Sequence, residues 1–202
     1  MHFIMKYIKY FICFILITCF LASCSDNNVD SVPLNQSTKD FFNIKNGSKY
    51  QFVSMLDTNT VSAYTVENYN NLFSNPDISN NEIIFYDMKS LNNPTFTIRA
   101  EAGNTKFNDR ITLLTRKNDS IFVGPICFNT SGTFSAVLDS KDTLTNIASI
   151  IFGNTSYTDV IKIAPFNHPL YKEIYYAKGF GLIARKERND AFYYSKNNQI
   201  IN

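Results

Sequence analysis

Several stretches of the chain alternate between apolar and polar residues, which is the pattern of a strand buried on one face. Thr95–Ala100 is the clearest example, because Phe96, Ile98 and Ala100 fall on one face and the polar residues on the other. Further runs that predict strands are Lys49–Met55, Val61–Val66, Ile83–Met88, Arg110–Arg116, Ser120–Val123, Phe134–Leu138 and Tyr157–Ile163. Turn-forming clusters of Asn, Asp and Ser separate them. The pattern predicts an all-β domain, a single antiparallel meander that forms a curved sheet, half-barrel or barrel, with at most one short helix at Leu144–Phe152.

The end of the chain predicts a closing hairpin. Leu182–Glu187 and Phe192–Tyr194 read as its two strands, with a turn near Asn189 and Asp190. Gly179 and Gly181 precede it in a strand-forming context. A glycine in such a place marks a turn, a bulge or the close approach of another part of the chain.

The first residues have the pattern of an export signal. Lys6 and Lys9 are followed by an almost wholly apolar stretch from Tyr10 to Leu21. That stretch has the length of a signal-peptide core and is shorter than the roughly 20 residues of a membrane-spanning helix. The alternative, an uncleaved membrane anchor, is disfavoured because the residues after Cys24 are polar and include no Lys or Arg cluster. We therefore expect a signal peptide at residues 1–23.

The four residues that close this signal resemble the lipobox of bacterial lipoproteins. Leu21, Ala22, Ser23 and Cys24 match its order of a leucine, two small residues and a cysteine. The resemblance implies cleavage between Ser23 and Cys24, with lipid attached to the Cys24 sulfur and further fatty acid, such as palmitate, on its amine. Two or more acyl chains anchor a protein stably in a membrane. The membrane is therefore an expected partner through Cys24.

The residue after the cysteine bears on the destination. Ser25 favours the outer membrane under the sorting rule of enteric bacteria, so we expect a cell envelope protein anchored in the outer membrane. Asp26 and Asp30 resemble, in a sparse form, the acidic surface-export signals of other Gram-negative groups. Either leaflet of the membrane is therefore open.

The segment after Cys24 is polar, poor in aromatic residues and without periodicity. These properties predict a lipidated cysteine and flexible tether at residues 24–39, followed by a β-rich domain at 40–202. Once Lys6 and Lys9 are removed, the 19 basic residues of the chain become 17, which equals its 17 acidic residues. A neutral domain lacks the basic face that nucleic acid requires.

The two ends of this domain resemble a family of Gram-negative bacterial lipoproteins. Asp40–Phe52 is similar to the aromatic-rich segment that opens the family's domain, and Tyr176–Ile183 to its closing segment, in which Tyr, Ala and two glycines precede Leu and Ile. Asn43 and Tyr50 depart from the family's usual Pro and Trp. The resemblance implies a curved antiparallel β domain and no known reaction.

Residues for catalysis or metal binding are scarce. His168 is the single histidine after the signal, and its neighbouring Pro residues predict a rigid surface loop rather than a general base. Cys127, the single cysteine after Cys24, lies in an apolar run and is expected to be buried. We expect no metal, no cofactor and no catalytic residue.

Four basic residues cluster near the closing hairpin, namely Lys178, Arg185, Lys186 and Arg188. One interpretation is a solvated strand edge, where charges oppose aggregation. The other is a contact patch for anionic lipid headgroups or an acidic glycan. The sequence favours the first interpretation and leaves the second open.

Taken together, these features predict a membrane-anchored envelope lipoprotein that acts as a non-catalytic binding or structural module. Its expected partner is another envelope protein or an apolar ligand, which a curved sheet rich in Phe and Tyr could hold. The alternative is a surface hydrolase acting on glycans or lipids, suggested by scattered carboxylates and His168.

Overall fold

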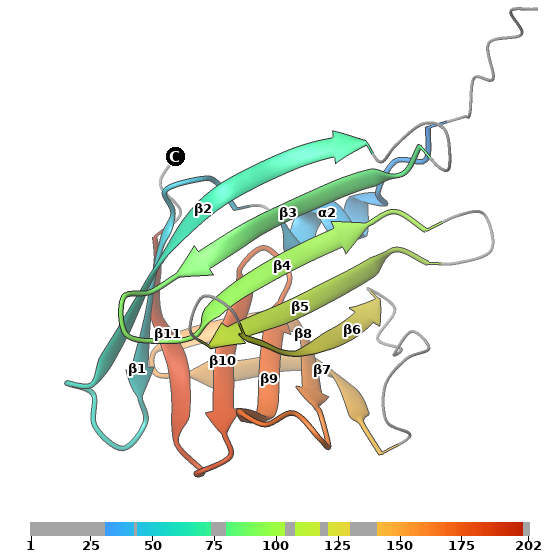
Figure 1. Cartoon of the computed structure of the whole chain (residues 1–202). Helices are drawn as coiled ribbons and strands as arrows, with labels where there is room; N and C mark the ends of the chain where they lie inside the picture. The colour runs from blue at the N-terminus through green and yellow to red at the C-terminus, as the bar shows by residue number, and fades with distance from the viewer. Residues whose placement is uncertain are drawn as a thin grey trace, which may run out of the picture. The chain divides into compact units, whose positions relative to one another are not determined.

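The computed structural model describes residues 31–42, 44–73, 80–103, 108–117, 121–129 and 141–199. These residues form one eleven-stranded antiparallel sheet and one short helix (Figure 1). The elements are α2 (Gln36–Phe41), β1 (Lys49–Ser54), β2 (Val61–Phe73), β3 (Glu82–Lys89), β4 (Thr95–Glu101), β5 (Arg110–Lys117), β6 (Ile121–Asn129), β7 (Thr143–Phe152), β8 (Thr155–Ala164), β9 (Tyr171–Ala177), β10 (Gly181–Glu187) and β11 (Phe192–Gln199).

The strand order follows the chain with a single exception. The order is β6-β5-β4-β3-β2-β1-β11-β10-β9-β8-β7, so neighbouring strands are consecutive in the chain everywhere except where β1 lies beside β11. The pairing of β1 with β11 joins two meanders, and β6 and β7 are the outermost strands. The sheet curls into a half-barrel (Figure 1), which confirms the predicted all-β class.

The strand predictions hold wherever the chain is described, and the helix prediction does not. Phe96, Ile98 and Ala100 are fully buried on one face of β4, as their alternation predicts. The predicted run Phe134–Leu138 lies outside the described residues. The predicted helix at Leu144–Phe152 is wrong, because this segment pairs along its length with β8 across a tight turn and so has its backbone hydrogen bonds satisfied as a strand.

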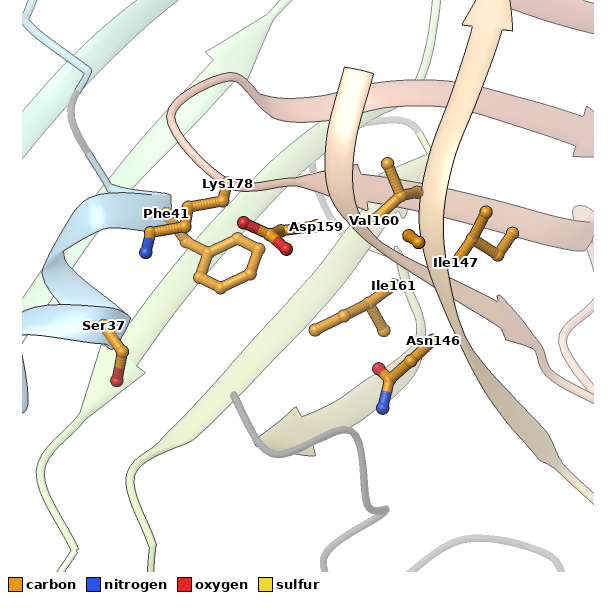
Figure 2. A pocket seen from close by; sticks show the side chains of 9 residues that line it. Ser37, Phe41, Asn146, Ile147, Asp159, Val160, Ile161 and Lys178 are labelled. Carbon is orange, nitrogen blue, oxygen red and sulfur yellow. The ribbon is translucent and has the colours of Figure 1, made fainter.

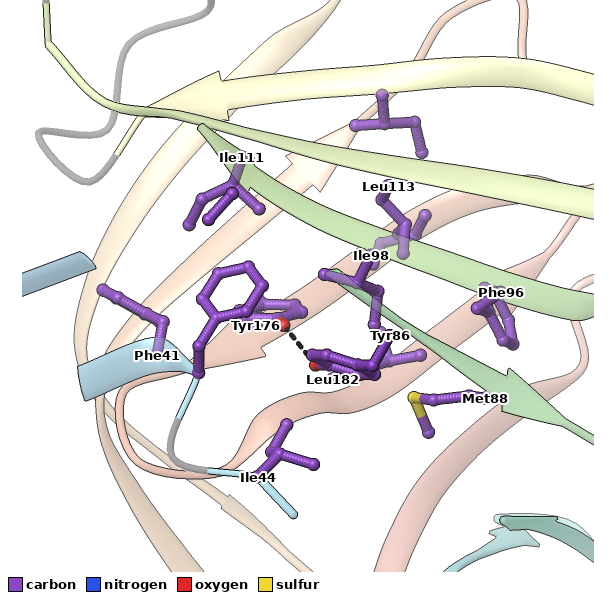
Figure 3. Packing of buried hydrophobic residues seen from close by; sticks show 14 of the residues in the cluster. Phe41, Ile44, Tyr86, Met88, Phe96, Ile98, Ile111, Leu113, Tyr176 and Leu182 are labelled. Atoms are coloured by element: carbon purple, nitrogen blue, oxygen red, sulfur yellow. Dashed lines mark hydrogen bonds between the residues drawn. The ribbon is translucent and has the colours of Figure 1, made fainter. Parts of the chain in front are cut away.

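The concave face of the half-barrel is a packed core (Figure 3). The two meanders touch through aromatic side chains. Phe96 of β4 stacks on Tyr171 of β9 with ring centres 5.8 Å apart, and Phe128 of β6 meets Tyr176 of β9 at the same separation. The hydroxyl groups of Tyr86 and Tyr176 share a buried hydrogen bond of 2.9 Å. The centre of the half-barrel is therefore filled by side chains.

A second apolar cluster covers the other face of β9–β11. Its members are Phe152, Tyr157, Val160, Tyr175, Ala177, Ile183 and Ala184. The cluster forms because β8 pairs with β9 only over Val160–Ile163, and Asp159, just before this stretch, has a left-handed φ of 51°. The rest of the β7–β8 hairpin bends over the sheet. At its turn, a Cβ on Gly153 would lie 2.8 Å from the ring of Tyr194 on β11, so glycine permits the close approach.

The N-terminal part of the domain is ordered earlier than the sequence predicts. Val32 forms a bridge with Asn81, Leu34 is buried, and α2 begins at Gln36. The predicted start of the compact domain at residue 40 is therefore too late. Composition does not reveal this earlier start, because polar contacts rather than apolar ones hold the segment to the sheet.

The closing hairpin has the predicted form. β10 pairs with β11, with Ala184 opposite Tyr194. Gly179 and Gly181 both have positive φ, of 76° and 73°, and a Cβ on Gly181 would lie 2.9 Å from Cδ1 of Ile44. A register shift after Leu182 follows the second glycine. This bulge decides which later residues of β10 face the core.

Candidate functional site

A cavity of about 500 Å³ lies between α2 and the β7–β8 hairpin (Figure 2). Its apolar lining comes from Phe41 of α2, Ile147 of β7, and Val160 and Ile161 of β8. Phe41 and Ile161 belong to the concave core, whereas Val160 belongs to the second cluster. The cavity therefore lies where the bend of β8 brings the two apolar clusters together.

Polar side chains complete the lining. Ser37 comes from α2, Asn146 from β7, Asp159 from the bend of β8, and Lys178 from the β9–β10 turn (Figure 2). An apolar floor with a few polar groups is the usual composition of a small-molecule site.

A second hollow of about 680 Å³ shares part of this lining. Asp159 and Lys178 line both hollows, and Gln36, Asp40 and Tyr69 are among the residues lining the second. The residues that line the second hollow are more polar than those that line the first. Asp159 and Lys178 thus border both spaces beside α2.

Contacts with the β9–β10 turn fix one side of α2. The Nζ of Lys178 lies 3.2 Å from a carboxylate oxygen of Asp40, and the N–H of Gly179 donates to the Asp40 carbonyl at 2.8 Å. Hydrogen bonds from Gln36 and Lys178 lower the pKa of Asp40. Asp40 is therefore an anion at neutral pH, and the positive charge of Lys178 has a partner.

Two buried carboxylates fix the segment before and within α2. Glu82 accepts from the Leu34 N–H at 2.9 Å, from Asn71 at 3.2 Å, and contacts the Lys39 Nζ at 2.8 Å. Burial raises the pKa of Glu82, but these hydrogen bonds outweigh burial and leave the pKa below its usual value. Asp109 accepts from the Asn35 N–H at 2.7 Å. The carboxylates thereby satisfy N–H groups that precede the helix, where its side-chain cap is absent.

The lining groups do not form a catalytic arrangement. Ser37 contributes a hydroxyl group to the cavity, and the described lining includes no histidine or cysteine that could activate it. Within the described ranges, no group of three or more His, Cys, Asp and Glu residues could hold a metal ion.

The structure places the four predicted basic residues in different surroundings. Lys178 borders the cavity, and Lys186 is 3.2 Å from a carboxylate oxygen of Asp190. Arg188 donates hydrogen bonds to the carbonyls of the β8–β9 loop. Arg185 is 1% exposed, because the β10 bulge turns it into the concave core. Its assignment to a surface patch is therefore wrong.

The two other singled-out residues are both buried. Cys127 is a free, buried cysteine, as predicted. His168 is also buried, at 6% exposure, so the prediction of a surface loop is wrong. Its Nδ1 accepts hydrogen bonds from the N–H groups of Leu170 and Tyr171, and its ring stacks on Tyr171. These contacts explain why a histidine between two prolines packs into the fold.

Ser23 and Cys24 lie outside the described residues. Among the residues that are described, no helix is long and apolar enough to cross a membrane. Comparison with known proteins adds no assignment, since no protein family, curated protein or solved structure matches the chain.

Of the residues that line the cavity, the sequence pointed to Lys178, as part of a basic patch, and did not point to Phe41, Asp159 or Ile161. Asp159 had a usable signal, because an aspartate within a β-branched run favours a break in the strand. Phe41 had none, since its role depends on a helix that only contacts distant in sequence hold in place.

Proposed function

We propose that this chain is a lipid-anchored envelope protein that binds an apolar ligand, without catalysis, in the cavity beside α2. The observation that carries the proposal is the cavity of about 500 Å³ with Phe41, Ile147, Val160 and Ile161 on its walls. Its volume lies within the range of about 300 to 1,000 Å³ that small-molecule sites occupy. Burial of apolar ligand surface against these side chains supplies the affinity.

The polar rim supports a ligand with one polar end. Asn146 offers both a donor and an acceptor, and Asp159 and Lys178 carry opposite charges at the same edge. A fatty acid or a related amphiphile combines an apolar chain with a group that such a rim can bind. A protein partner is the alternative, and ligand titration separates the two.

The anchor is supported by the signal and lipobox pattern at residues 1–24. Its test is Cys24→Ser. We expect this variant to lose incorporation of labelled palmitate and to leave the membrane fraction, because a hydroxyl cannot form the thioether. Unchanged labelling or membrane association would contradict the anchor without bearing on the cavity.

The cavity can be tested with two adjacent substitutions on β7. Ala148 is exposed and lines the cavity, whereas its neighbour Ser149 is equally exposed and is not among the residues that line it. Ala148→Phe should fill the cavity and weaken binding of the fluorescent fatty acid cis-parinaric acid by about tenfold or more, the loss expected from about 1.4 kcal/mol. Ser149→Phe adds the same ring outside the cavity and should leave binding unchanged.

Three outcomes count against apolar-ligand binding. These are no uptake of the probe by the unchanged chain at saturating concentration, binding by both variants equal to that of the unchanged chain, and an equal loss of binding in both variants. A protein partner captured by the chain and released by neither substitution would favour the alternative.

A further inference from the structure

The strand ends farthest from α2 surround a buried cation. The guanidinium carbon of Arg185 lies 4.6 Å from the ring centre of Tyr193, 5.1 Å from Phe52, 5.6 Å from Tyr64 and 5.9 Å from Phe96. Aromatic faces attract a guanidinium electrostatically. They accept none of its five N–H groups as a carboxylate would.

Polar contacts of Arg185 are few for so buried a charge. Its Nη2 donates to the Ser62 Oγ at 3.5 Å, and Oε1 of Glu187 is 3.8 Å from its Nε, beyond hydrogen-bond distance. Within the described part of the chain, Nε and Nη1 have no hydrogen-bond partner. A buried cation with so few polar contacts lowers the stability of the fold. Its electric field is also weakly screened, because the surrounding core is apolar.

A polar relay leads from this cation to a surface pocket. The Ser62 Oγ also donates to Oδ1 of Asn93 at 3.4 Å, and Nδ2 of Asn93 donates to the Ser90 Oγ at 3.0 Å. Asn93 and Ser90 line a pocket of about 300 Å³ formed by the β3–β4 turn and the end of β5. Arg185 is thus two hydrogen bonds from the pocket wall.

The lining of this pocket combines two cations with neutral polar side chains. Arg116 and Lys117 lie at its edge with Asn92 and Asn93, and the described lining includes no carboxylate. Arginine and amide N–H groups are donors suited to carboxylate and phosphate oxygens. The front of the pocket and the field of Arg185 behind it therefore favour the same kind of ligand.

We propose that this pocket binds an oxyanion, a carboxylate or phosphate group, through Arg116, Lys117 and Asn93, with Arg185 as a positioning residue behind it. Arg185 acts in two ways. It holds the Asn93 amide in place through Ser62, and it adds positive potential that water screens poorly. The site is separate from the cavity beside α2 and does not depend on the function proposed for that cavity.

The proposal is tested by titrating the full chain with inorganic phosphate and, separately, with acetate, against chloride at equal ionic strength. Binding is followed by the ¹H–¹⁵N resonances of the arginine side chains. The anion that shifts the Arg116 signal at the lower concentration identifies the preferred group. Arg116→Gln should weaken binding by about tenfold or more, as loss of a charge-assisted contact does.

Substitutions at Arg185 separate its charge from its packing. Arg185→Met should weaken anion binding about threefold to tenfold, and Arg185→Lys, which keeps the charge, should restore most of it. Glu187→Gln removes the nearest negative charge and should tighten binding. Lys45→Gln, an exposed cation near α2, serves as the control for net charge and should have no effect.

Several results overturn the proposal. These are no response to either anion above that to chloride, equal weakening by Lys45→Gln and Arg116→Gln, or a Glu187→Gln variant that binds no tighter. If Arg185→Met fails to fold, the Glu187→Gln and Arg116→Gln results decide. Equal anion binding by folded Arg185→Met and the unchanged chain would remove Arg185 from the site.

Discussion

The two ends of the half-barrel treat buried charges and tyrosine hydroxyl groups differently. Beside α2, Tyr86 and Tyr176 bond to each other, and Glu82 has contacts with Leu34, Asn71 and Lys39. At the far end, Arg185 has one long hydrogen bond and two nitrogen atoms without one, among the described residues. Hydrogen-bonded pairs of this kind stabilise a fold, whereas a buried charge with unused donors can still bind a ligand. One core can therefore hold tightly paired groups at one end and an incompletely paired cation at the other.

The largest loss of stability is expected from a substitution at the α2 end. Tyr176→Ala removes a fully buried ring that contacts Phe41 and Phe128 and leaves the Tyr86 hydroxyl unpaired. We expect a loss of about 3 to 5 kcal/mol in the free energy of unfolding, measured by urea denaturation. The double variant Tyr86→Phe with Tyr176→Phe removes both hydroxyls and should cost far less, because neither partner is left unsatisfied. A cost of the double variant equal to that of Tyr176→Ala would refute the role assigned to this pair.

A second test compares two glycines of the β9–β10 turn. Gly179→Ala and Gly181→Ala both place a Cβ at positive φ, with a backbone cost of about 1 kcal/mol each. Only Gly181 has a neighbour in the way, since Cδ1 of Ile44 lies 2.9 Å from the Cβ position, while nothing lies within 4 Å at Gly179. Gly181→Ala should therefore lower the thermal midpoint further than Gly179→Ala does. An equal fall in the thermal midpoint of both variants would show that Ile44 does not pack tightly against Gly181.

A smaller and pH-dependent effect is expected at Glu82. Its lowered folded-state pKa means that its contribution to stability is full above the ordinary pKa of 4.5 and is lost as pH falls through the folded value. Glu82→Gln should cost about 1 kcal/mol near neutral pH and should remove this part of the acid sensitivity below about pH 4.5. The measurement is the midpoint of urea denaturation of the unchanged chain and of Glu82→Gln, taken between pH 3 and 7 in steps of roughly one pH unit. If the midpoints of the two chains changed in parallel with pH, ionised Glu82 would not be the acid-sensitive contact that holds α2.

How much of the fold the sequence predicts depends on the range of the contacts involved. The strands were predictable because alternation such as that of Phe96, Ile98 and Ala100 is a local property. The pairing of β1 with β11 and the covering of the outer face by β7–β8 were not, since they depend on curvature and on a bend at Asp159. The local alternation of apolar and polar residues identifies the buried face of a strand, but it does not show which part of the chain covers that face.

The candidate sites were harder to predict for the same reason. α2 has a six-residue sequence without a strong cap, and it is held by Glu82 and Asp109, which are distant in the chain. Arg185 was assigned to the surface because its neighbours Lys186 and Arg188 are charged. A single-residue register shift in β10 reverses that assignment. Bulges of this kind are not visible in composition or in local periodicity.

The smallest expected change in stability is at Arg185, and its sign distinguishes the two ends most directly. If Arg185 were a stabilising core residue, Arg185→Met would cost several kcal/mol, as loss of one partner from a buried pair does. The compensation of Arg185 is poor, so exchanging a desolvated cation for an apolar side chain of similar length should leave the free energy of unfolding within about 1 kcal/mol, or raise it. Urea denaturation at neutral pH measures this difference, and Phe96→Ala, in the same aromatic surroundings, shows what a true packing loss costs. A loss in Arg185→Met as large as that of Phe96→Ala would mean that the cation is integral to the core. A near-neutral change, together with weakened anion binding, would mean that the fold retains Arg185 for recognition.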